Sequence, residues 1–500
     1  MWLRRALCAL FLFAAGSAHA AHRPTVPLSD GSQSFLAMRC DGTTDVSAQL
    51  AEAVSYAASR KMVVSLPSGI CRFTSPQVWD QAAVGHWGLR GSGSYQTTLL
   101  YDGASVTADL IQIGNCGDPT NHPVYGLTLS NLKIDSNVTM SGGSAMHACG
   151  VAQSHVDHLI WGGQNGTHKL FHGPWFDVFD AVHVDFFEAA GASTADSFRL
   201  NGNSAGSFGA DLYLTHGKIS LGRNGLHIGG GQGGTTCSDV AIIANGTNVL
   251  IDHALSGSAN REVFLGDTCV IDTAGWPPGP TGGGDNILIN DPLASNGHMT
   301  INGWASSGHA NNIHVVSWPS GSIAIGSAVN TNSTGDGIRV EDATTTTINI
   351  SSGAQINKNG GLGVNCTVPT NNIFSGTEPA ANTGGQWAAN CHQESGLAPL
   401  SNGYRKHPDG IVEQWVQVGF TGAANTILSP AGGNPVALPV AFPNNMFDYS
   451  ITCTPAGFGN GIQNLTVTAN PNAATGLSIF LISSGAVSSP QLVNCRVLGN

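Results

Sequence analysis

The feature that most constrains this chain is a series of short strand-like segments between residues 120 and 366. Each segment alternates apolar and polar residues, and glycine, asparagine and serine separate one segment from the next. Examples are "GLTLSN", "AVHVDF", "DLYLTH", "GLHIGG", "NILIND" and "TINISS". Alternation at period two indicates β-strands, and recurrence every 20–40 residues or so is typical of a solenoid.

Two arrangements are open to such segments, parallel coils and antiparallel hairpins. Hairpins need short turns such as Asn-Gly between strands of equal length, and these are not the rule here. The composition suits a turn-rich all-β protein, because glycine makes up 66 of 500 residues and charged residues only 10%, against about 25% in ordinary domains. We therefore favour a parallel β-helix over an antiparallel sandwich.

The alternation allows each strand to be assigned to the first, second or third position in a coil of three strands; we call this assignment the phasing. In this phasing one coil separates Val182 from Leu212, and one coil separates Phe198 from Leu226. The predicted strand starts are Val182, Leu212, Val240, Val270, Ile313 and Ile348 for first strands; Ile219, Val249, Ile287, Ile323 and Ile356 for second strands; and Phe198, Leu226, Val263, Met299, Ile338 and Gly363 for third strands.

The segment "CDGTTDVSAQLAEAVSYAASRKMVVSLPSGICRF", which starts at Cys40, combines an Asp-Gly-x-x-Asp turn, a helix and a strand ending in Pro-x-Gly. It resembles the entry of the pectate-lyase-like superfamily, in the variant shared with phage tailspikes. The resemblance implies a right-handed parallel β-helix solenoid over 21–366, with an N-terminal cap at about 30–75. Residues 48–58 then form the capping helix, and Asp45 accepts backbone N–H bonds at its start.

The resemblance is specific for the fold rather than for an activity. This fold carries lyases, hydrolases, isomerases and plain binding stalks, so function has to be argued from particular residues. The sequence motifs of polygalacturonases and of calcium-dependent pectate lyases are absent.

The N-terminus has the pattern of a bacterial export signal. Arg4 and Arg5 precede an apolar run over 6–15, and Ala18-His19-Ala20 fits a cleavage site, so residues 1–20 are predicted to be removed. An uncleaved N-terminal anchor is the alternative. No later segment reaches the roughly 18 apolar residues of a membrane helix. We therefore expect a secreted or periplasmic protein with no membrane contact after leader removal.

Cysteine usage agrees with export. Ten of the eleven cysteines lie outside the leader and form neighbouring couples along the chain. Successive coils would bring several of these couples together as disulfides, whereas a metal cluster is the alternative. No C-x-x-C or C-x-x-H spacing occurs, so we expect no metal site and no cofactor. The couples are Cys40/Cys71, Cys116/Cys149, Cys237/Cys269, Cys366/Cys391 and Cys453/Cys495.

The composition changes after the solenoid. Residues 367–401 are rich in Asn, Gly, Thr and Ala and are predicted to be a linker, while 402–500 alternate as strands of a compact β-sandwich. The stretch "NGYRKHPDGIVEQW", which starts at Asn402, resembles the C-terminal domain of phage tail-fibre proteins. Such domains commonly trimerise a fibre or touch a host surface, so the resemblance implies a homotrimer.

The alternation also predicts which side chains point outward. Val182 and Val184 face inward, so His183 and Asp185 face outward, and Tyr213 lies one coil on from His183 at about 4.8 Å between backbones. A His–Tyr pair suits β-elimination, in which one group removes a proton and the other protonates the leaving oxygen. Asp185 would act as a carboxylic acid or orient His183. The alternative is an ordinary polar strand surface.

A second candidate is Arg199 with His227 one coil on, a small basic spot that would hold a uronate or a sulfate. The alternative is surface charge without a ligand. Tryptophans at loops or strand ends would either stack on sugar rings or fill the core. They are Trp161, Trp175, Trp276, Trp304 and Trp318.

Two hypotheses on function remain. The first is an exported polysaccharide-degrading enzyme, a lyase or a glycoside hydrolase, with its site on the outer face of the β-helix. The second is a glycan-binding or structural surface protein of the tailspike type. A net charge of −12, or −14 without Arg4 and Arg5, argues against a nucleic-acid partner. It also means that an acidic polysaccharide would need a local basic patch.

Overall fold

The computed structural model describes most of the chain from residue 38 to residue 391 and separate strands on either side. The predicted leader lies outside the described residues. The described residues are 25–27, 33–35, 38–81, 85–162, 168–202, 211–231, 233–272, 284–294, 296–306, 310–326, 329–341, 346–351, 353–367, 373–375, 379–388, 391, 403–406, 412–422, 427–428, 436–437, 450–456, 462–469, 476–483 and 487–499.

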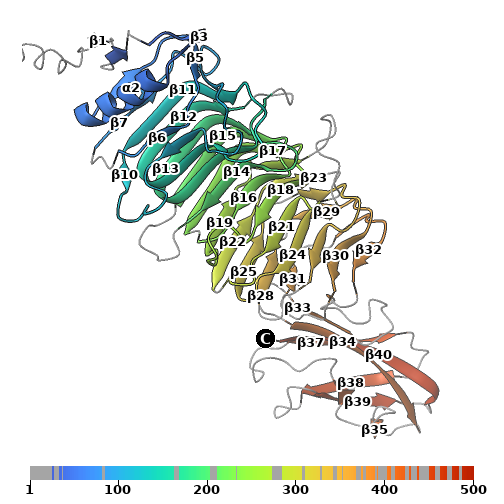
Figure 1. The fold of residues 1–500 in the computed structure, drawn as a ribbon. Helices are drawn as coiled ribbons and strands as arrows, with labels where there is room; N and C mark the ends of the chain where they lie inside the picture. Colours follow the sequence, from blue (N-terminus) through green and yellow to red (C-terminus); the bar gives the residue numbers. More distant parts are fainter. Residues whose placement is uncertain are drawn as a thin grey trace, which may run out of the picture. The chain divides into compact units, whose positions relative to one another are not determined.

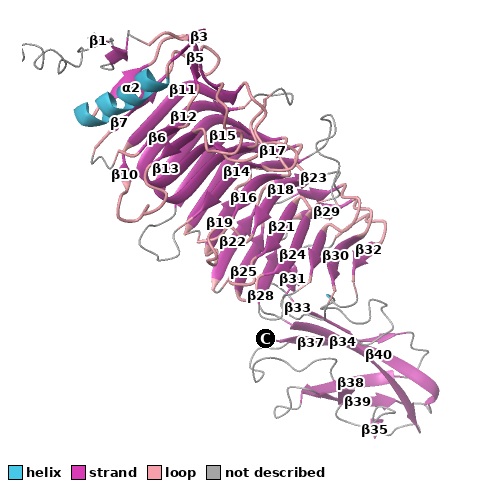
Figure 2. Ribbon diagram, viewed as in Figure 1, coloured by secondary structure: helices cyan, strands magenta, loops and turns pink. Residues whose placement is uncertain are grey.

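The helix α2 (Ser47–Arg60) forms where the sequence predicts one, and it is the cyan element of Figure 2. Its buried residues Leu50, Ala53, Val54 and Ala57 recur at helical spacing and pack towards β4, β6 and β7, whose bounds follow below. Val46 is the N-cap, one residue after the predicted position. Asp45 nevertheless accepts the backbone N–H of Ser47 at 3.0 Å.

The chain divides into two compact units, Met1–Ser258 with Gly275–Gly282, and Ala259–Ala274 with Gly283–Asn500. In the first unit the strands pair in parallel in three rows (Figure 1). The first row contains β2 (Gln33–Phe35), β4 (Val63–Ser65), β7 (Trp87–Arg90), β11 (Leu127–Ser136), β12 (Ser144–Trp161), β13 (His172–Ala190), β15 (Asp211–Ser220) and β17 (Gly234–Ile243).

The second row begins with β3 (Asp41–Asp45), β5 (Gly69–Phe73) and β8 (Thr97–Tyr101), and continues through the later parts of β11, β12, β13, β15 and β17. The third row contains β6 (Gln77–Trp79), β9 (Ile111–Ile113), the early parts of β12 and β13, β14 (Asp196–Asn201), β16 (Asn224–Ile228) and β18 (Thr247–Ile251). β1 (Thr25–Pro27) pairs antiparallel with β2, and β10 (Val124–Tyr125) pairs with β12.

Each long strand takes part in more than one row because it bends at residues with a left-handed backbone conformation. In β12 the bends fall at Gly150, Gln153 and His158, all with positive φ. A side chain at Gly150 would place its Cβ 2.3 Å from the carbonyl oxygen of Pro119, so this corner requires glycine. These corners turn each coil from one face of the solenoid to the next.

The second unit repeats the three-row arrangement in parallel register. One row is β19 (Glu262–Leu265), β22 (Gly297–Ile301), β25 (Gly321–Ile325), β28 (Thr346–Ile350) and β31 (Ile373–Ser375). Another is β20 (Val270–Asp272), β23 (Trp304–Ser306), β26 (Val329–Thr331) and β29 (Gln355–Asn357). The third is β21 (Ile287–Asn290), β24 (Ile313–Ser317), β27 (Ile338–Val340), β30 (Leu362–Cys366) and β32 (Gly385–Trp387).

The observed rows correct the predicted phasing. Val182 pairs with Leu212, and Phe198 pairs with Leu226, as predicted. Ile287, however, pairs with Ile313 although the phasing gave them to different rows. The error arises because the loops between strands differ in length, so equal spacing along the chain does not mark equal positions in a coil.

The region after the solenoid also differs from the expected linker. β31 and β32 lie within 367–401, yet they pair in parallel with β28 and β30 as further coil strands. Beyond residue 402 the described strands form two antiparallel sheets. One contains β33 (Gly403–Lys406), β34 (Val412–Gly422), β40 (Val487–Gly499) and β37 (Ser450–Ala456); the other contains β35 (Ile427–Leu428), β36 (Val436–Ala437), β38 (Ile462–Ala469) and β39 (Gly476–Ser483).

Each coil encloses an apolar core. Trp161 and Trp318 are completely buried, so of the two readings offered for them core filling is correct. Phe198 stacks on Phe176 at 5.6 Å between ring centroids, and its ring lies 5.7 Å from that of Phe187. Trp276 lies outside the described residues. No helix in the described part of the chain is long and apolar enough to cross a membrane.

Candidate functional site

An exposed row of rings crosses β12, β13 and β15. His155, His183 and Tyr213 are partners in register, as predicted for the last two. The rings of His183 and Tyr213 stack at 4.6 Å with 13° between their planes, and His155 meets His183 edge-on at 6.3 Å. Both histidines are exposed and Tyr213 is half-buried. We call these three residues the histidine face.

The alternation of each strand sets the direction of these side chains. Val182 and Val184 are completely buried on either side of His183, and Leu212 and Leu214 are buried on either side of Tyr213. Apolar burial therefore fixes the backbone, and the parallel register brings the two rings together. The packing of the apolar core, rather than contacts among the three rings, therefore sets the position of the histidine face.

Asp185 lies at the corner beside the histidine face. Its carboxylate accepts hydrogen bonds from the Thr215 hydroxyl at 2.8 Å, from His216 Nδ1 at 2.8 Å and from the Phe186 backbone at 3.1 Å. Burial alone would raise the pKa of Asp185, but these bonds outweigh it and hold the pKa below its usual value. Asp185 thus stays ionised and orients His216, rather than His183 as predicted.

A second set of rings runs along the same corner. His158, Phe186 and His216 all have positive φ and stack in sequence, with 4.7 Å between neighbouring ring centroids. Phe186 is 47% exposed. On each of β12, β13 and β15, the residue of the histidine face and the residue of this second set are only three positions apart. Aromatic and imidazole groups therefore cover this part of the surface.

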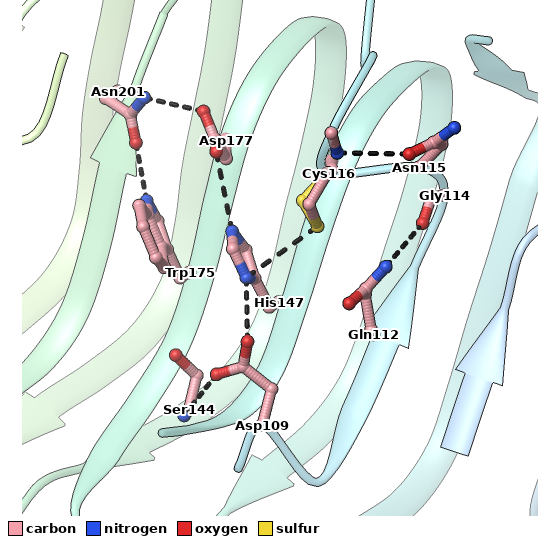
Figure 3. Close-up of a disulfide and its surroundings, with 12 residues drawn as sticks. Asp109, Gln112, Gly114, Asn115, Cys116, Ser144, His147, Trp175, Asp177 and Asn201 are labelled. Carbon is pink, nitrogen blue, oxygen red and sulfur yellow. Dashed lines mark hydrogen bonds and ion pairs between the residues drawn. A yellow bond between two sulfur atoms is a disulfide. The ribbon is translucent and has the colours of Figure 1, made fainter. Parts of the chain in front are cut away.

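The third row of strands carries a different set of polar side chains, of which His147, Arg199 and His227 are buried; Figure 3 shows the part around His147. Gln112, His147, Trp175, Arg199 and His227 are partners in register on β9, β12, β13, β14 and β16. We call the last four of these, with the aspartates that bind them, the polar seam.

One end of the polar seam is an Asp–His–Asp arrangement. His147 donates from Nδ1 to Asp109 at 2.9 Å, and its Nε2 lies 3.5 Å from Asp177 (Figure 3). Asp177 also accepts a hydrogen bond from the Asn201 amide at 2.6 Å. Burial disfavours the charged imidazole, but the two aspartates outweigh it and raise the pKa of His147. The two aspartates therefore favour the protonated form of this histidine.

Trp175 and Arg199 fill the middle of the seam. The Trp175 ring stacks on His147 at 3.9 Å with 5° between the planes, and the Arg199 guanidinium lies 4.3 Å from its centre. Since neighbours from the preceding and following coils cover the ring, Trp175 has no open face for a sugar. Arg199 donates to the Ser144 hydroxyl.

The other end of the seam repeats the Asp–His–Asp arrangement. His227 bonds to Asp196 at 2.9 Å and to Asp252 at 3.0 Å. Burial opposes the charged form, yet the two carboxylates raise the pKa of His227 to about 9. The pKa of Asp196 falls to about 2, against the effect of burial, chiefly because of His227. Both groups are therefore charged at neutral pH.

Arg199 and His227 are neighbours, as predicted, but they are not an exposed basic spot. Their exposed fractions are 9% and 5%, and both side chains are occupied by bonds within the protein. Contact with a uronate or sulfate would require them to leave these partners, so substrate binding at this pair stays a prediction.

Cys116, His147 and Cys149 form a compact group with metal-binding atoms within 4.8 Å of one another. The two sulfur atoms are joined in a disulfide, so neither is a thiolate ligand. The geometry therefore gives a disulfide packed against an imidazole, with His147 Nδ1 3.8 Å from the Cys116 sulfur.

No role was assigned from the sequence to Asp177, which was noted only as a carboxylate near His183, and the sequence did not point to Asp109, His147, Asp196 or Asp252. Three of them, His147, Asp177 and Asp196, lie on strands that pair in parallel. If the early part of β12 had been assigned to a row, the register from Gln112 to His227 would have predicted the polar seam. Asp109 and Asp252 lie in loops and have no strand signal.

Together these features define the chain as a parallel β-helix protein. No protein-family model and no curated protein matches it. Similar solved structures include a double mutant of the tailspike protein of E. coli bacteriophage HK620, with a TM-score of 0.44, 10% identity and 98% and 99% of the two chains covered. Another is the tailspike protein gp49 from Acinetobacter baumannii bacteriophage Fri1, a capsular polysaccharide depolymerase, with a TM-score of 0.32, 12% identity and 93% and 85% covered.

An N-truncated R1-type pyocin tail fibre also matches, at 25% identity and a TM-score of 0.15, over 21% of this chain and 80% of that one. The tailspikes are the class of protein that the sequence resemblance names. The sequence identity between these tailspikes and this chain is low.

Proposed function

We propose that this protein is an exported enzyme that binds an extracellular or cell-surface polysaccharide at the histidine face and cleaves it by β-elimination. The observation that carries the proposal is the stacking of exposed His183 on Tyr213, at 4.6 Å between ring centroids. The pair supplies a base and a proton donor side by side on one open surface.

β-Elimination gives each of the two residues one task. His183 takes the proton from C5 of a uronate residue, the bond from C4 to the glycosidic oxygen breaks, and a C4–C5 double bond forms. Tyr213 gives its hydroxyl proton to the departing oxygen. The proton count balances, because one proton enters His183 and one leaves Tyr213, and solvent exchange restores both groups.

The state of Asp185 favours elimination over hydrolysis. A glycoside hydrolase needs a carboxylic acid that keeps its proton near neutral pH. The pKa of Asp185 lies below its usual value, because its bonds to His216, Thr215 and the Phe186 backbone outweigh the effect of burial. Asp185 is therefore a poor proton donor for a glycosidic oxygen.

A non-catalytic glycan-binding protein is the second candidate. His158, Phe186 and His216 favour it: Phe186 is 47% exposed, and the outer edges of these stacked rings offer apolar surface beside polar groups, which suits sugar rings with their apolar and hydroxylated sides. This candidate predicts binding at the same surface without bond cleavage.

A panel of uronate-containing polysaccharides and bacterial exopolysaccharides separates the candidates. We expect reducing ends and the ultraviolet absorbance of a new double bond to rise together. His183→Ala and Tyr213→Phe should each lower the rate about 10²- to 10⁴-fold, while His298→Ala, an exposed histidine on β22, should not. Reducing ends without absorbance would indicate a hydrolase, and binding without either signal would indicate the second candidate.

Export and assembly belong to the same proposal. Cleavage after Ala20 would release the protein into the periplasm or the medium, and N-terminal sequencing of the exported protein tests it. A homotrimer is proposed from the resemblance of the C-terminal segment to tail-fibre proteins, and light scattering of the purified protein tests that.

A further inference from the structure

The three rings of the histidine face form one line across neighbouring coils. His155 on β12, His183 on β13 and Tyr213 on β15 are partners in register, so His183 lies between the other two residues. Within the described part of the chain, the three side chains make ring contacts with one another and no hydrogen bonds. Their polar atoms are therefore open to a ligand.

The contact between His183 and Tyr213 decides from which side they can approach a sugar. Their ring centroids are 4.6 Å apart, with 13° between the planes. A sugar ring lying between them would need a gap of about 7–8 Å, twice the contact distance between carbon atoms. The strands β13 and β15 stay paired on both sides of these residues, so the backbones do not part to admit a sugar. Both groups therefore meet the same side of a bound polysaccharide.

We propose that the histidine face catalyses a syn elimination, an inference that rests on the proposed function. In a syn elimination the hydrogen on C5 and the oxygen on C4 leave from the same side of the sugar ring. The substrate is then a uronate that carries this hydrogen and this oxygen on one side, as D-glucuronate and D-mannuronate do. D-galacturonate, L-guluronate and L-iduronate carry them on opposite sides, and the two stacked rings reach only one of them.

The bond changes balance within this arrangement. His183 takes the C5 proton, and the electron pair of the C–H bond forms the C4–C5 double bond. The C4–O bond breaks with its electron pair on the oxygen. Tyr213 lies beside His183, so its hydroxyl proton passes to that oxygen on the same side of the sugar ring. Proton exchange with water returns both residues to their starting states.

His155 is then placed to bind the carboxylate of the same sugar. The carboxylate carbon and C4 are both attached to C5, so the carboxylate and the leaving oxygen lie on either side of the departing hydrogen. His155 and Tyr213 lie on either side of His183 in the same order. A donor to the carboxylate stabilises the negative charge that develops at C5. The predicted acid-binding pair, Arg199 and His227, is buried, whereas His155 is exposed.

The stereochemistry is tested first on any polymer that the protein cleaves. Analysis of the uronates before and after cleavage shows which one is converted to the unsaturated sugar, and we expect glucuronate or mannuronate. Polymannuronate and polyguluronate, and likewise chondroitin and dermatan, then compare sugars that are epimers at C5. The guluronate or iduronate polymer should react at least about 10²-fold more slowly, because either the base or the proton donor misses its target.

The role of His155 is tested on the same polymer. His155→Ala should lower kcat/KM about 10- to 100-fold, the effect of one lost hydrogen bond to a charged group. His155→Gln keeps a donor and should retain most of the rate. Methyl esterification of the substrate should remove the difference between the wild type and His155→Ala. His298→Ala, a change at an exposed histidine on β22, should leave kcat/KM unchanged.

The outcomes separate this inference from the proposed function. A double bond formed from glucuronate or mannuronate supports both. A double bond formed from galacturonate, guluronate or iduronate overturns the syn elimination and leaves the lyase in place. Cleavage without a double bond, or no cleavage of any polymer, rejects the lyase and this inference with it. An unchanged kcat/KM in His155→Ala overturns its role at the carboxylate, and thermal melting shows whether each variant is folded.

Discussion

At the scale of single residues, His227 links stability to pH. Its pKa is about 9 in the folded protein against 6.5 for an ordinary histidine, because Asp196 and Asp252 outweigh the effect of burial. A histidine whose pKa is raised in the folded protein stabilises the fold fully below pH 6.5. This stabilisation is lost as the pH rises through 9. We expect the free energy of unfolding to fall by on the order of 3 kcal/mol between pH 6 and pH 9.5, measured by urea titration.

The control for this prediction is His227→Gln. This variant should be less stable at pH 6 and should show a much smaller fall towards pH 9.5. Part of the fall remains, because the pKa values of His147 and His314 are also raised, against the effect of burial, by their acidic partners. A wild-type stability that stays constant over this range would contradict the charged state assigned to His227.

The same scale shows what sequence reasoning could reach. His183 and Tyr213 were found because each is flanked by buried apolar residues at period two. His147 was missed because β12 changes face at Gly150, Gln153 and His158, and period-two alternation cannot be followed through left-handed corners. The partners of a side chain depend on these corners, so Asp185 was paired with the wrong histidine.

At the scale of elements, a ladder of buried asparagines connects successive coils of the second unit. The Asn359 side chain accepts from Asn312 at 3.1 Å and from the Ser333 backbone at 3.1 Å, and it donates to Asn382 at 2.8 Å. Asn359→Ala leaves buried donors without an acceptor, at about 1–3 kcal/mol each. We therefore expect a loss of about 2–5 kcal/mol in the free energy of unfolding, measured by chemical denaturation.

A matched substitution separates the ladder from asparagine in general. Asn349 lies on β28, is half-buried and points away from the core. Asn349→Ala should change stability by no more than about 0.5 kcal/mol. Equal losses in the two variants would show that the ladder contributes nothing particular.

Elements differ in how far the sequence alone predicts them. The helix α2 was placed to within two residues at each end because its apolar spacing is local. The strands were recognised individually, but their rows were partly misassigned: Ile323 pairs with Ile348, which the phasing gave to another row. Row membership depends on loop length, which the strand pattern does not encode.

At the scale of the whole molecule, the cysteine couples report the period of the coils. Three predicted couples are disulfides, with sequence separations of 31, 33 and 25 residues. Cys237, Cys269 and Cys495 are also disulfide-bonded, and Cys453 stands opposite Cys495 in the sheet. Neighbours along the chain become neighbours in space because each coil packs on the next.

The disulfide between Cys366 and Cys391 then has a local effect that can be measured. It closes a segment with a sequence separation of 25 residues, and this segment contains β32, which pairs with β30. Removing it by Cys366→Ser with Cys391→Ser should cost about 3 kcal/mol through the entropy of the unfolded chain. Since a coil contacts only its neighbours, hydrogen exchange should quicken in peptides that cover β32 and stay unchanged in those that cover β25. Faster exchange throughout the second unit would mean that the coils unfold as one cooperative body.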